Sequence, residues 1–343
     1  MTNGNQGTLL STLTFPEFTD LVRHIWVEEK DKIVPVARQL FIFDPIGSGQ
    51  GGTKRYDELD SDTFADYLAE GTDSSKAKHG VGYNVTMTAR AFSKEVDITW
   101  PMRVQNRYQE VNDKITSLAS LIEQRQELDL THRLTFATSS SYTDKNGITV
   151  ATTVGDGNVL AYATHALAFS STTYSNRVTA DPAFSESALE AAMNLATSNI
   201  YNNFGEKRVK NFNVIFMGEN DQASIKSAQQ LIRSSADPDA VQSGVTNVYM
   251  GKFRLVVLPY LSTTAAGAYD STKKRWWGIA AVGQGSAGWQ AYLGEWVAPE
   301  LFSPSIGSNG EDIHNFNWTY STRGMYGICT VSPKGIIFSC PTS

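Results

Sequence analysis

The stretch of residues 101–137, PMRVQNRYQEVNDKITSLASLIEQRQELDLTHRLTFA, decides the fold. No glycine or proline interrupts the chain between residues 102 and 146, and Pro101 stands where a helix can begin. Apolar residues recur here at intervals of four, three and four, at Val111, Ile115, Leu118 and Ile122. This is the spacing of one helix face. It predicts one helix of roughly 30 residues, about 45 Å long at ~1.5 Å per residue.

The rest of the chain mixes helical and strand-like text without regular alternation. Further helices are expected at about residues 16–23, 185–204 and 219–233, the second with Ser187 and Glu190 at capping-box spacing. Strands are expected at residues 83–89, 212–217, 254–258, 276–282, 289–297 and 319–322, and in a closing hairpin formed by 326–331 and 336–340. Because a doubly wound sheet needs strands and helices to alternate, this order predicts an α+β fold.

Composition excludes several classes of protein. The 343 residues are 41% hydrophobic and 19% charged, with 29 basic and 35 acidic residues and a formal net charge of −6. A dedicated nucleic-acid binder is normally basic. No run approaches the ~18 apolar residues of a membrane span, and the polar start Met1 to Gly7 does not resemble a signal peptide. We therefore expect no membrane partner and action in the compartment of synthesis.

A long segment ahead of the predicted helix has little apolar periodicity. From residue 42 to 83 the chain is rich in glycine and acidic residues, and it is expected to project as a loop or hairpin that cannot bury a core of its own. Such a loop needs a neighbouring molecule to order it, since fixing each residue costs about 1–2 kcal/mol. The residues predicted to form an assembly interface are Gly47, Gly52, Lys54, Arg55, Asp57, Glu58, Asp60 and Asp62.

Motifs for phosphate and dinucleotide binding are imitated but incomplete. Gly47, Gly52 and Lys54 resemble a phosphate-binding loop, but Thr53 precedes the lysine and no helix is predicted to follow. Residues 283–288 match G-x-G-x-x-G, yet strand-like text follows where the fingerprint needs a helix. Both are better explained as loops or turns.

Candidate catalytic and metal-binding residues are scattered. The five histidines are His24, His79, His132, His165 and His314, and none forms an H-x-x-x-H pair. Cys329 and Cys340 are too few for a disulfide framework and are expected to be unlinked thiols. The sequence therefore predicts no enzyme, no cofactor and no metal site, with His132 as a partly exposed structural residue of the long helix.

The order of features resembles the major capsid proteins of tailed bacteriophages, which have the Hong Kong 97-type fold. An arm, a projecting loop, one very long helix and a compact α+β region follow one another in these proteins. Residues 164–169 (THALAF), 174–176 (YSN) and the helix from Phe184 to Met193 look like the corresponding stretch of Mu-like head proteins. The end, from Tyr320 to Gly327 and then Pro333 to Ile336, is similar to their terminal strands.

This resemblance implies boundaries, partners and location. It implies an N-terminal arm at 1–41, an extended loop at 42–100, a peripheral domain with the spine helix at 101–205, an axial domain at 206–309, and a return to the peripheral domain at 310–343. Such subunits form hexamers and pentamers of an icosahedral shell around double-stranded DNA, with scaffold and portal proteins as partners. The expected location is the virion, assembled in the bacterial host cytoplasm.

Three other interpretations stay open at this point. An encapsulin-like compartment shares the fold and encloses enzymes instead of a genome. An intracellular enzyme with a site at the 283–288 turn is the alternative from a different class, and another virion component, such as a tube or decoration protein, is a third. Particle mass separates an enzyme from a shell.

Overall fold

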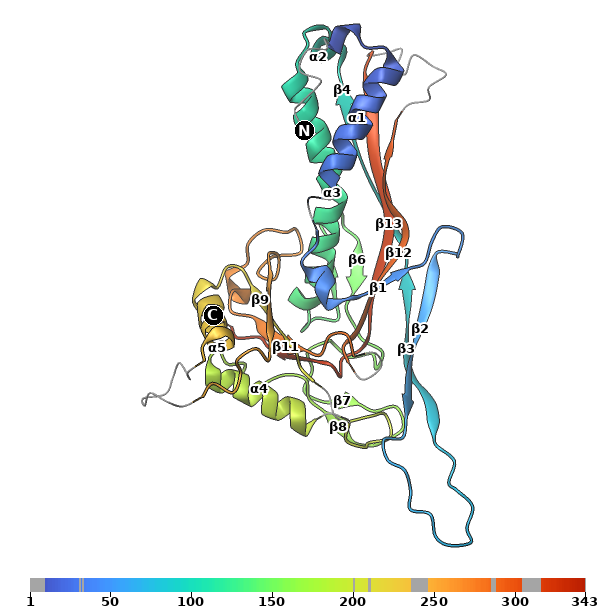
Figure 1. Cartoon of the computed structure of the whole chain (residues 1–343), viewed down its shortest axis with the longest axis vertical. Helices are drawn as coiled ribbons and strands as arrows, with labels where there is room; N and C mark the ends of the chain where they lie inside the picture. The colour runs from blue at the N-terminus through green and yellow to red at the C-terminus, as the bar shows by residue number, and fades with distance from the viewer. Residues whose placement is uncertain are drawn as a thin grey trace.

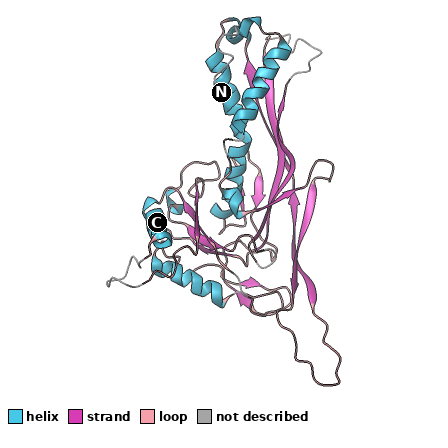
Figure 2. Ribbon diagram, viewed as in Figure 1, coloured by secondary structure: helices cyan, strands magenta, loops and turns pink. Residues whose placement is uncertain are grey.

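The computed structural model confirms an α+β fold with several separate sheets and few helices (Figures 1 and 2). It describes residues 10–30, 32, 34–199, 201–208, 211–235, 246–284, 288–303 and 316–342. The histidine at position 314 and the middle of the 283–288 turn, both considered above, lie outside these residues.

A long helix runs beside a long antiparallel sheet in the upper part of Figure 1. Helix α3 (Tyr108–Thr135) carries the predicted apolar stripe on its buried side, where Val111, Ile115 and Leu118 are fully covered. The stripe packs on α1 (Phe15–Lys30) and on the strands β4 (Arg90–Ile98) and β13 (Trp318–Ser332). At ~1.5 Å per residue the helix is about 42 Å long, which makes it the rigid axis of this half of the chain.

The predicted helix is interrupted near its start, contrary to the expectation of one continuous element. Trp100–Val104 forms a separate short helix, α2, which the Arg107 amide closes by donating to the Met102 carbonyl oxygen. Asn106 lies between them with φ of 52°, in the left-handed region that asparagine tolerates at helix ends. The absence of glycine and proline therefore did not guarantee continuity.

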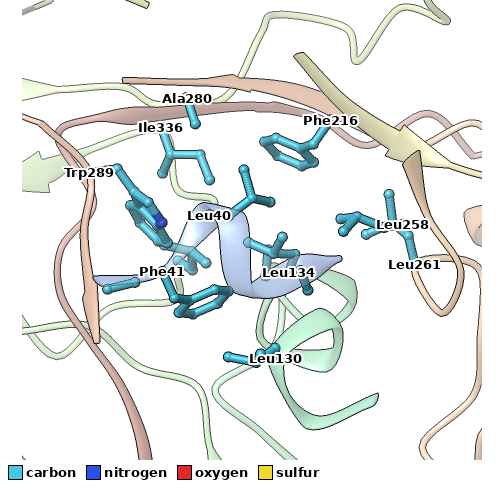
Figure 3. Packing of buried hydrophobic residues seen from close by; sticks show 14 of the residues in the cluster. Leu40, Phe41, Leu130, Leu134, Phe216, Leu258, Leu261, Ala280, Trp289 and Ile336 are labelled. Atoms are coloured by element: carbon cyan, nitrogen blue, oxygen red, sulfur yellow. The ribbon is translucent and has the colours of Figure 1, made fainter. Parts of the chain in front are cut away.

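A second sheet forms the compact lower region of Figure 1. Its strand order is β10 (Arg254–Leu258), β9 (Val214–Gly218), β11 (Trp277–Ala280) and β14 (Ile336–Ser339). One of its faces packs on α4 (Glu186–Ser198) and α5 (Gln222–Arg233). The other face packs on the end of α3 and on the short helix η2 (Ala37–Leu40), and Figure 3 shows Leu40 and Leu134 pointing toward Phe216 and Ile336 in this core. This core joins the long helix to the second sheet.

Some element boundaries differ from the sequence predictions. The closing hairpin is wrong, because β13 and β14 (Ile336–Ser339) belong to different sheets, and residues 333–335 carry the chain from one sheet to the other. Ser185, and not Ser187, caps α4, since the Ser185 hydroxyl accepts from the Ala188 amide at 3.1 Å. Helix α1 is also longer than predicted, with Phe18 and Val22 buried against α3.

The remaining elements complete the two halves of the chain. The strands are β1 (Ile42–Pro45), β2 (Thr53–Ser61), β3 (His79–Thr88), β5 (Ser141–Thr143), β6 (Thr149–Ala151), β7 (His165–Ala166), β8 (Thr173–Tyr174), β9 (Val214–Gly218), β10 (Arg254–Leu258), β11 (Trp277–Ala280) and β12 (Gln290–Phe302), and short helical turns are η1 (Leu10–Thr12) and η3 (Ser271–Lys273). Strands β12, β13 and β4 form the long sheet with β1 at its edge. Strand β4 thus belongs to the long sheet although it lies within residues 42–100 of the expected extended loop.

Candidate assembly surface

The projecting segment is a β-hairpin with a long irregular end. Strands β2 and β3 pair antiparallel from Thr53–Thr88 to Ser61–His79, with a bulge between Asp57 and Leu59. Residues 62–78 continue away from the body of the subunit without regular structure, at the bottom right of Figure 1. The hairpin therefore has an attached part and a free part.

An ion cluster fastens the attached part to its own subunit. The Lys334 ammonium lies 2.9 Å from a Glu58 carboxylate oxygen and 3.8 Å from Asp60, and all three side chains are more than nine-tenths buried. Arg208 pairs with Asp60 at 2.9 Å, and Asp60 also accepts from the Asn203 amide at 2.8 Å. Burial raises the pKa of Glu58, but the Lys334 charge and the hydrogen bonds from Asn203, Lys334 and Ser332 together outweigh it and lower that pKa below its usual value.

A second group of hydrogen bonds holds the strand end just beyond this cluster. The Asn202 side-chain amide donates to the Ser61 carbonyl oxygen and to the Thr63 hydroxyl, both at 3.1 Å. Glu206 accepts from the Thr63 backbone amide at 2.6 Å. The strand and its continuation are thus held at Glu58 by Lys334, and at residues 60–63 by the segment that follows α4.

Two glycines of β3 allow this close attachment. A Cβ atom at Gly82 would lie 2.5 Å from the Asn203 side-chain nitrogen and 3.1 Å from Glu58. At Gly80 it would lie 2.5 Å from the Phe169 ring. A side chain at either position would require Asn203 or Phe169 to shift, or the hairpin to move away from the subunit.

The root of the hairpin is fixed by aromatic and charged contacts. Asp44 of β1 accepts from Lys54 at 2.5 Å and from the Tyr56 hydroxyl, and Tyr56 stacks on Tyr292 with ring centroids 4.3 Å apart. Met87 packs in a small core with Trp296 and neighbouring side chains of β12 and β13. This root buries apolar side chains in a core shared with the long sheet, so the hairpin is anchored there by contacts with β12 and β13.

Exposed apolar side chains lie on the outward side of the hairpin end. Leu59 and Val81 form a cross-strand pair, and their side chains are 64% and 51% exposed. Phe64, Tyr67 and Leu68 of the free part are each at least 64% exposed. The exposed Arg55–Asp57 ion pair lies on the same side nearer the root, so the apolar groups are found at the end of the hairpin among charged side chains. Clustered exposed apolar groups of this kind mark interaction sites.

The eight predicted interface residues divide between the two faces. Gly47, Gly52, Arg55 and Asp57 are exposed, Lys54 is half-buried beside Asp44, and Asp62 accepts from the Lys78 amide at 2.9 Å. Glu58 and Asp60 point into their own subunit, so their charges are neutralised there. The assignment of all eight to an intersubunit interface stays a prediction.

The apolar residues of the surface were missed by sequence reasoning. Phe64, Tyr67 and Leu68 lie in a glycine- and acid-rich segment that appeared only polar. A signal existed, because three large apolar side chains within five residues have no helical or strand-like partners in a segment that cannot bury them. Their position on the projecting end of the hairpin identifies them as candidate contact residues.

The other candidate residues have structural roles. His132 is fully buried, contrary to the expectation of partial exposure, and contacts the Thr263 hydroxyl at 3.0 Å, while burial lowers its pKa to about 4. His165 is buried and pairs with Asp156 at 2.7 Å. Cys329 and Cys340 are free and buried, and burial raises the pKa of each thiol to about 12. Such thiols are poor nucleophiles.

The described residues contain neither a metal-binding cluster nor a membrane-spanning helix. No group of three or more His, Cys, Asp or Glu side chains there is arranged to hold a metal ion. No helix in that part of the chain is long and apolar enough to cross a membrane.

Comparison with known proteins gives structural likenesses at low sequence identity. No protein-family model and no curated protein matches the chain. Similar solved structures include the capsid of the cyanophage P-SCSP1u, with 13% identity over 88% of this chain and 86% of that one and a TM-score of 0.48. A structure from Gordonia phage Cozz has 11% identity over 89% of this chain and 85% of that one, with a TM-score of 0.49. A virus-like particle from Pyrococcus furiosus has 12% identity over 93% of this chain and 97% of that one, with a TM-score of 0.44.

Proposed function

We propose that this chain is the major capsid protein of a tailed bacteriophage, a structural subunit with the Hong Kong 97-type fold. Copies of it assemble as hexamers and pentamers into an icosahedral shell around double-stranded DNA. It is not an enzyme and takes no cofactor. Scaffold and portal proteins are its partners, and it resides in the virion after assembly in the bacterial host cytoplasm.

The exposed apolar side chains at the end of the hairpin are the observation that carries this proposal. Leu59, Val81, Phe64, Tyr67 and Leu68 expose apolar surface on a segment that is fastened to its own subunit through the buried Glu58 and Asp60. Removing apolar surface from water is worth about 25 cal/mol per Å². A neighbouring copy offers that burial, and the conformational entropy lost by ordering residues 62–78 is offset there.

The geometry of the contact favours a lattice over a small closed oligomer. A projecting hairpin meets a different surface on its neighbour, so the contact is heterologous, and heterologous contacts close rings or extend further. The α3 axis, braced by α1 and the long sheet, gives each subunit a fixed length over which curvature can be set. These two properties suit a shell subunit.

The purified protein and a shortened-hairpin variant test the proposal. In the variant, residues 64–76 are replaced by Asn-Gly, which leaves the Asp62 to Lys78 backbone hydrogen bond of 3.2 Å able to close the hairpin. We expect wild type to form megadalton particles in sedimentation and negative-stain micrographs. The variant should stay folded by circular dichroism and sediment as single subunits or small rings.

A second variant replaces the apolar side chains alone. Phe64→Ser, Tyr67→Ser and Leu68→Ser together keep the chain length and should also block shell closure. A wild-type protein that stays monomeric with its co-expressed scaffold would refute the proposal. Closed particles from both variants would show that the hairpin end is not the contact. Particles filled with a protein cargo would favour the nanocompartment.

A further inference from the structure

A groove beside the open edge of the second sheet has the chemistry of a second contact site. It has a volume of 330 Å³ and lies between α5 and the strand β10, which is the edge strand of its sheet. The partly buried side chains of Ile232, Leu255 and Val257 line it, together with buried Phe253. Edge strands leave backbone groups able to pair with another chain, and natural proteins normally cover or charge them.

The charged lining of this groove is entirely basic. Arg233 and Arg254 line it, and Lys226 lines a shallow hollow that continues along the exposed face of α5 and shares Arg233 and Gln229 with the groove. None of the described lining residues is acidic. Among the described residues, these three cations make no ion pair.

Exposed apolar side chains lie next to the groove. Val248 and Met250 are 76% and 56% exposed. The Gly251 amide, adjacent to Met250, donates to the Ile232 carbonyl oxygen at 3.1 Å, which places this turn against the end of α5. Lys252 follows and is exposed. An apolar centre with a charged rim is the composition of a protein interface.

We propose that this groove, defined by Lys226, Arg233, Lys252, Arg254 and their apolar neighbours, receives an acidic surface of a second copy of this chain. The charge balance selects a second copy. The whole chain carries −6, so without these four cations the remainder carries −10. The rest of a neighbouring copy is therefore acidic on average, whereas this groove is locally basic. Contact between the basic groove of one copy and an acidic surface of the next is favourable, whereas contact between two such grooves is repulsive.

This inference rests on the proposed assembly and gives it a second contact, independent of the hairpin. Since the basic groove meets a different surface on its partner, the contact is heterologous and can close a ring of subunits. Rim charges act strongly on association and its salt dependence. Assembly of the wild type should therefore weaken as ionic strength rises.

Carbodiimide cross-linking of isotope-mixed particles tests the contact directly. Particles are assembled from equal amounts of ¹⁴N- and ¹⁵N-labelled wild-type protein, and carbodiimide joins amines to carboxylates in direct contact. We expect mixed-isotope peptides that link Lys226 or Lys252 to an Asp or Glu of the other copy. Assembled particles in which neither lysine gives a mixed-isotope link would overturn the inference, while the proposed function would stand.

A charge-reversal pair provides the second arm. Arg233→Glu with Arg254→Glu should raise the protein concentration at which assembly begins by about tenfold or more, with an unchanged melting temperature because both side chains are exposed. Lys145→Glu with Arg275→Glu makes the same charge change at other exposed sites and should assemble as wild type does. If both charge-reversed proteins begin to assemble at the same concentration, the proposed contact at the groove is refuted. If wild type does not assemble, the proposed function fails instead.

Discussion

Lys334 is the residue on which attachment of the hairpin most depends. Its ammonium reaches Glu58 at 2.9 Å and the Asn203 side-chain oxygen at 2.6 Å, and it stands between the long sheet and the second sheet. It thus joins three segments that are distant in sequence. A single side chain couples the direction of the hairpin to the body of the subunit.

Replacing this lysine should loosen the hairpin. Lys334→Met leaves the Glu58 carboxylate buried without its cation, and breaking a buried pair in this way costs about 3–5 kcal/mol. Urea unfolding measures the loss, and limited proteolysis should cut residues 62–78 faster. Lys76→Met, at an exposed position, is the control and should be neutral. Equal stability of the two variants would mean that the cluster does not hold the hairpin.

The same cluster predicts loss of stability in acid. The pKa of Glu58 in the folded chain lies below its usual value of 4.5, so the unfolded chain binds the proton more readily. The stabilisation is fully present above pH 4.5 and is lost as the pH falls through the folded pKa. Urea midpoints measured from pH 6 to pH 3 should fall more steeply for wild type than for Glu58→Gln. Parallel pH profiles would contradict this assignment.

Leu118 tests the helix assignment at one position. It is fully buried in the core between α1, α3 and the long sheet, so Leu118→Asp should destabilise the subunit by at least ~3 kcal/mol through an unpaired buried carboxylate. Leu118→Met nearly conserves volume and should cost less than about 1.5 kcal/mol. Thermal unfolding followed by circular dichroism distinguishes them. If Leu118→Asp melts at the same temperature as wild type, this face of α3 is exposed to solvent.

At the scale of elements, helical periodicity was the reliable signal. The stripe from Val111 to Ile122 predicted α3 and its buried face, because one amphipathic helix is specified locally by its own spacing. The interruption at Asn106 was not predicted, since the left-handed backbone there is allowed but not demanded by asparagine. Type and position of an element follow from local sequence more readily than its ends.

Strand pairing could not be predicted in the same way. Residues 326–331 and 336–340 read as a hairpin because a Ser-Pro-Lys-Gly turn separates them, yet β14 pairs with β11 and β13 pairs with β12 and β4. The competing partners are distant in sequence, and their hydrophobic patterns are equally compatible. The inward position of Glu58 could not be predicted for the same reason, because its burial depends on Lys334, which is 276 positions away in the chain.

Gly82 makes a prediction for the hairpin as an element. Gly82→Ala places a methyl group 2.5 Å from Asn203, which should cost about 1–3 kcal/mol and tilt the hairpin away from its subunit. Gly52→Ala meets nothing within 4 Å and has an ordinary φ, so it is the matched control. Hydrogen exchange of β2 and β3 measures the effect. Unchanged protection in the first variant would show that the contact yields without cost.

At the scale of the whole molecule, assembly should order the free part of the hairpin. Residues 64–78 are exposed along their whole length, so their amides should exchange within seconds in the free subunit and become protected in the shell. Strand β9, buried at every residue, should be protected in both states. Mass-spectrometric hydrogen exchange of subunit and particle checks this. Fast exchange of residues 64–78 in intact particles would exclude them from the contact.

The late position of β14 in the chain has a consequence for biosynthesis. Its residues Ile336, Ile337 and Phe338 are buried, and β14 extends the second sheet beside β11 and also bridges Arg177. These side chains follow β11 in the chain, so the sheet cannot be completed until residues 336–339 have been synthesised. A polypeptide that stops before residue 336 lacks this strand and leaves β11 uncovered. Such a polypeptide cannot complete the second sheet, whatever the state of its other elements.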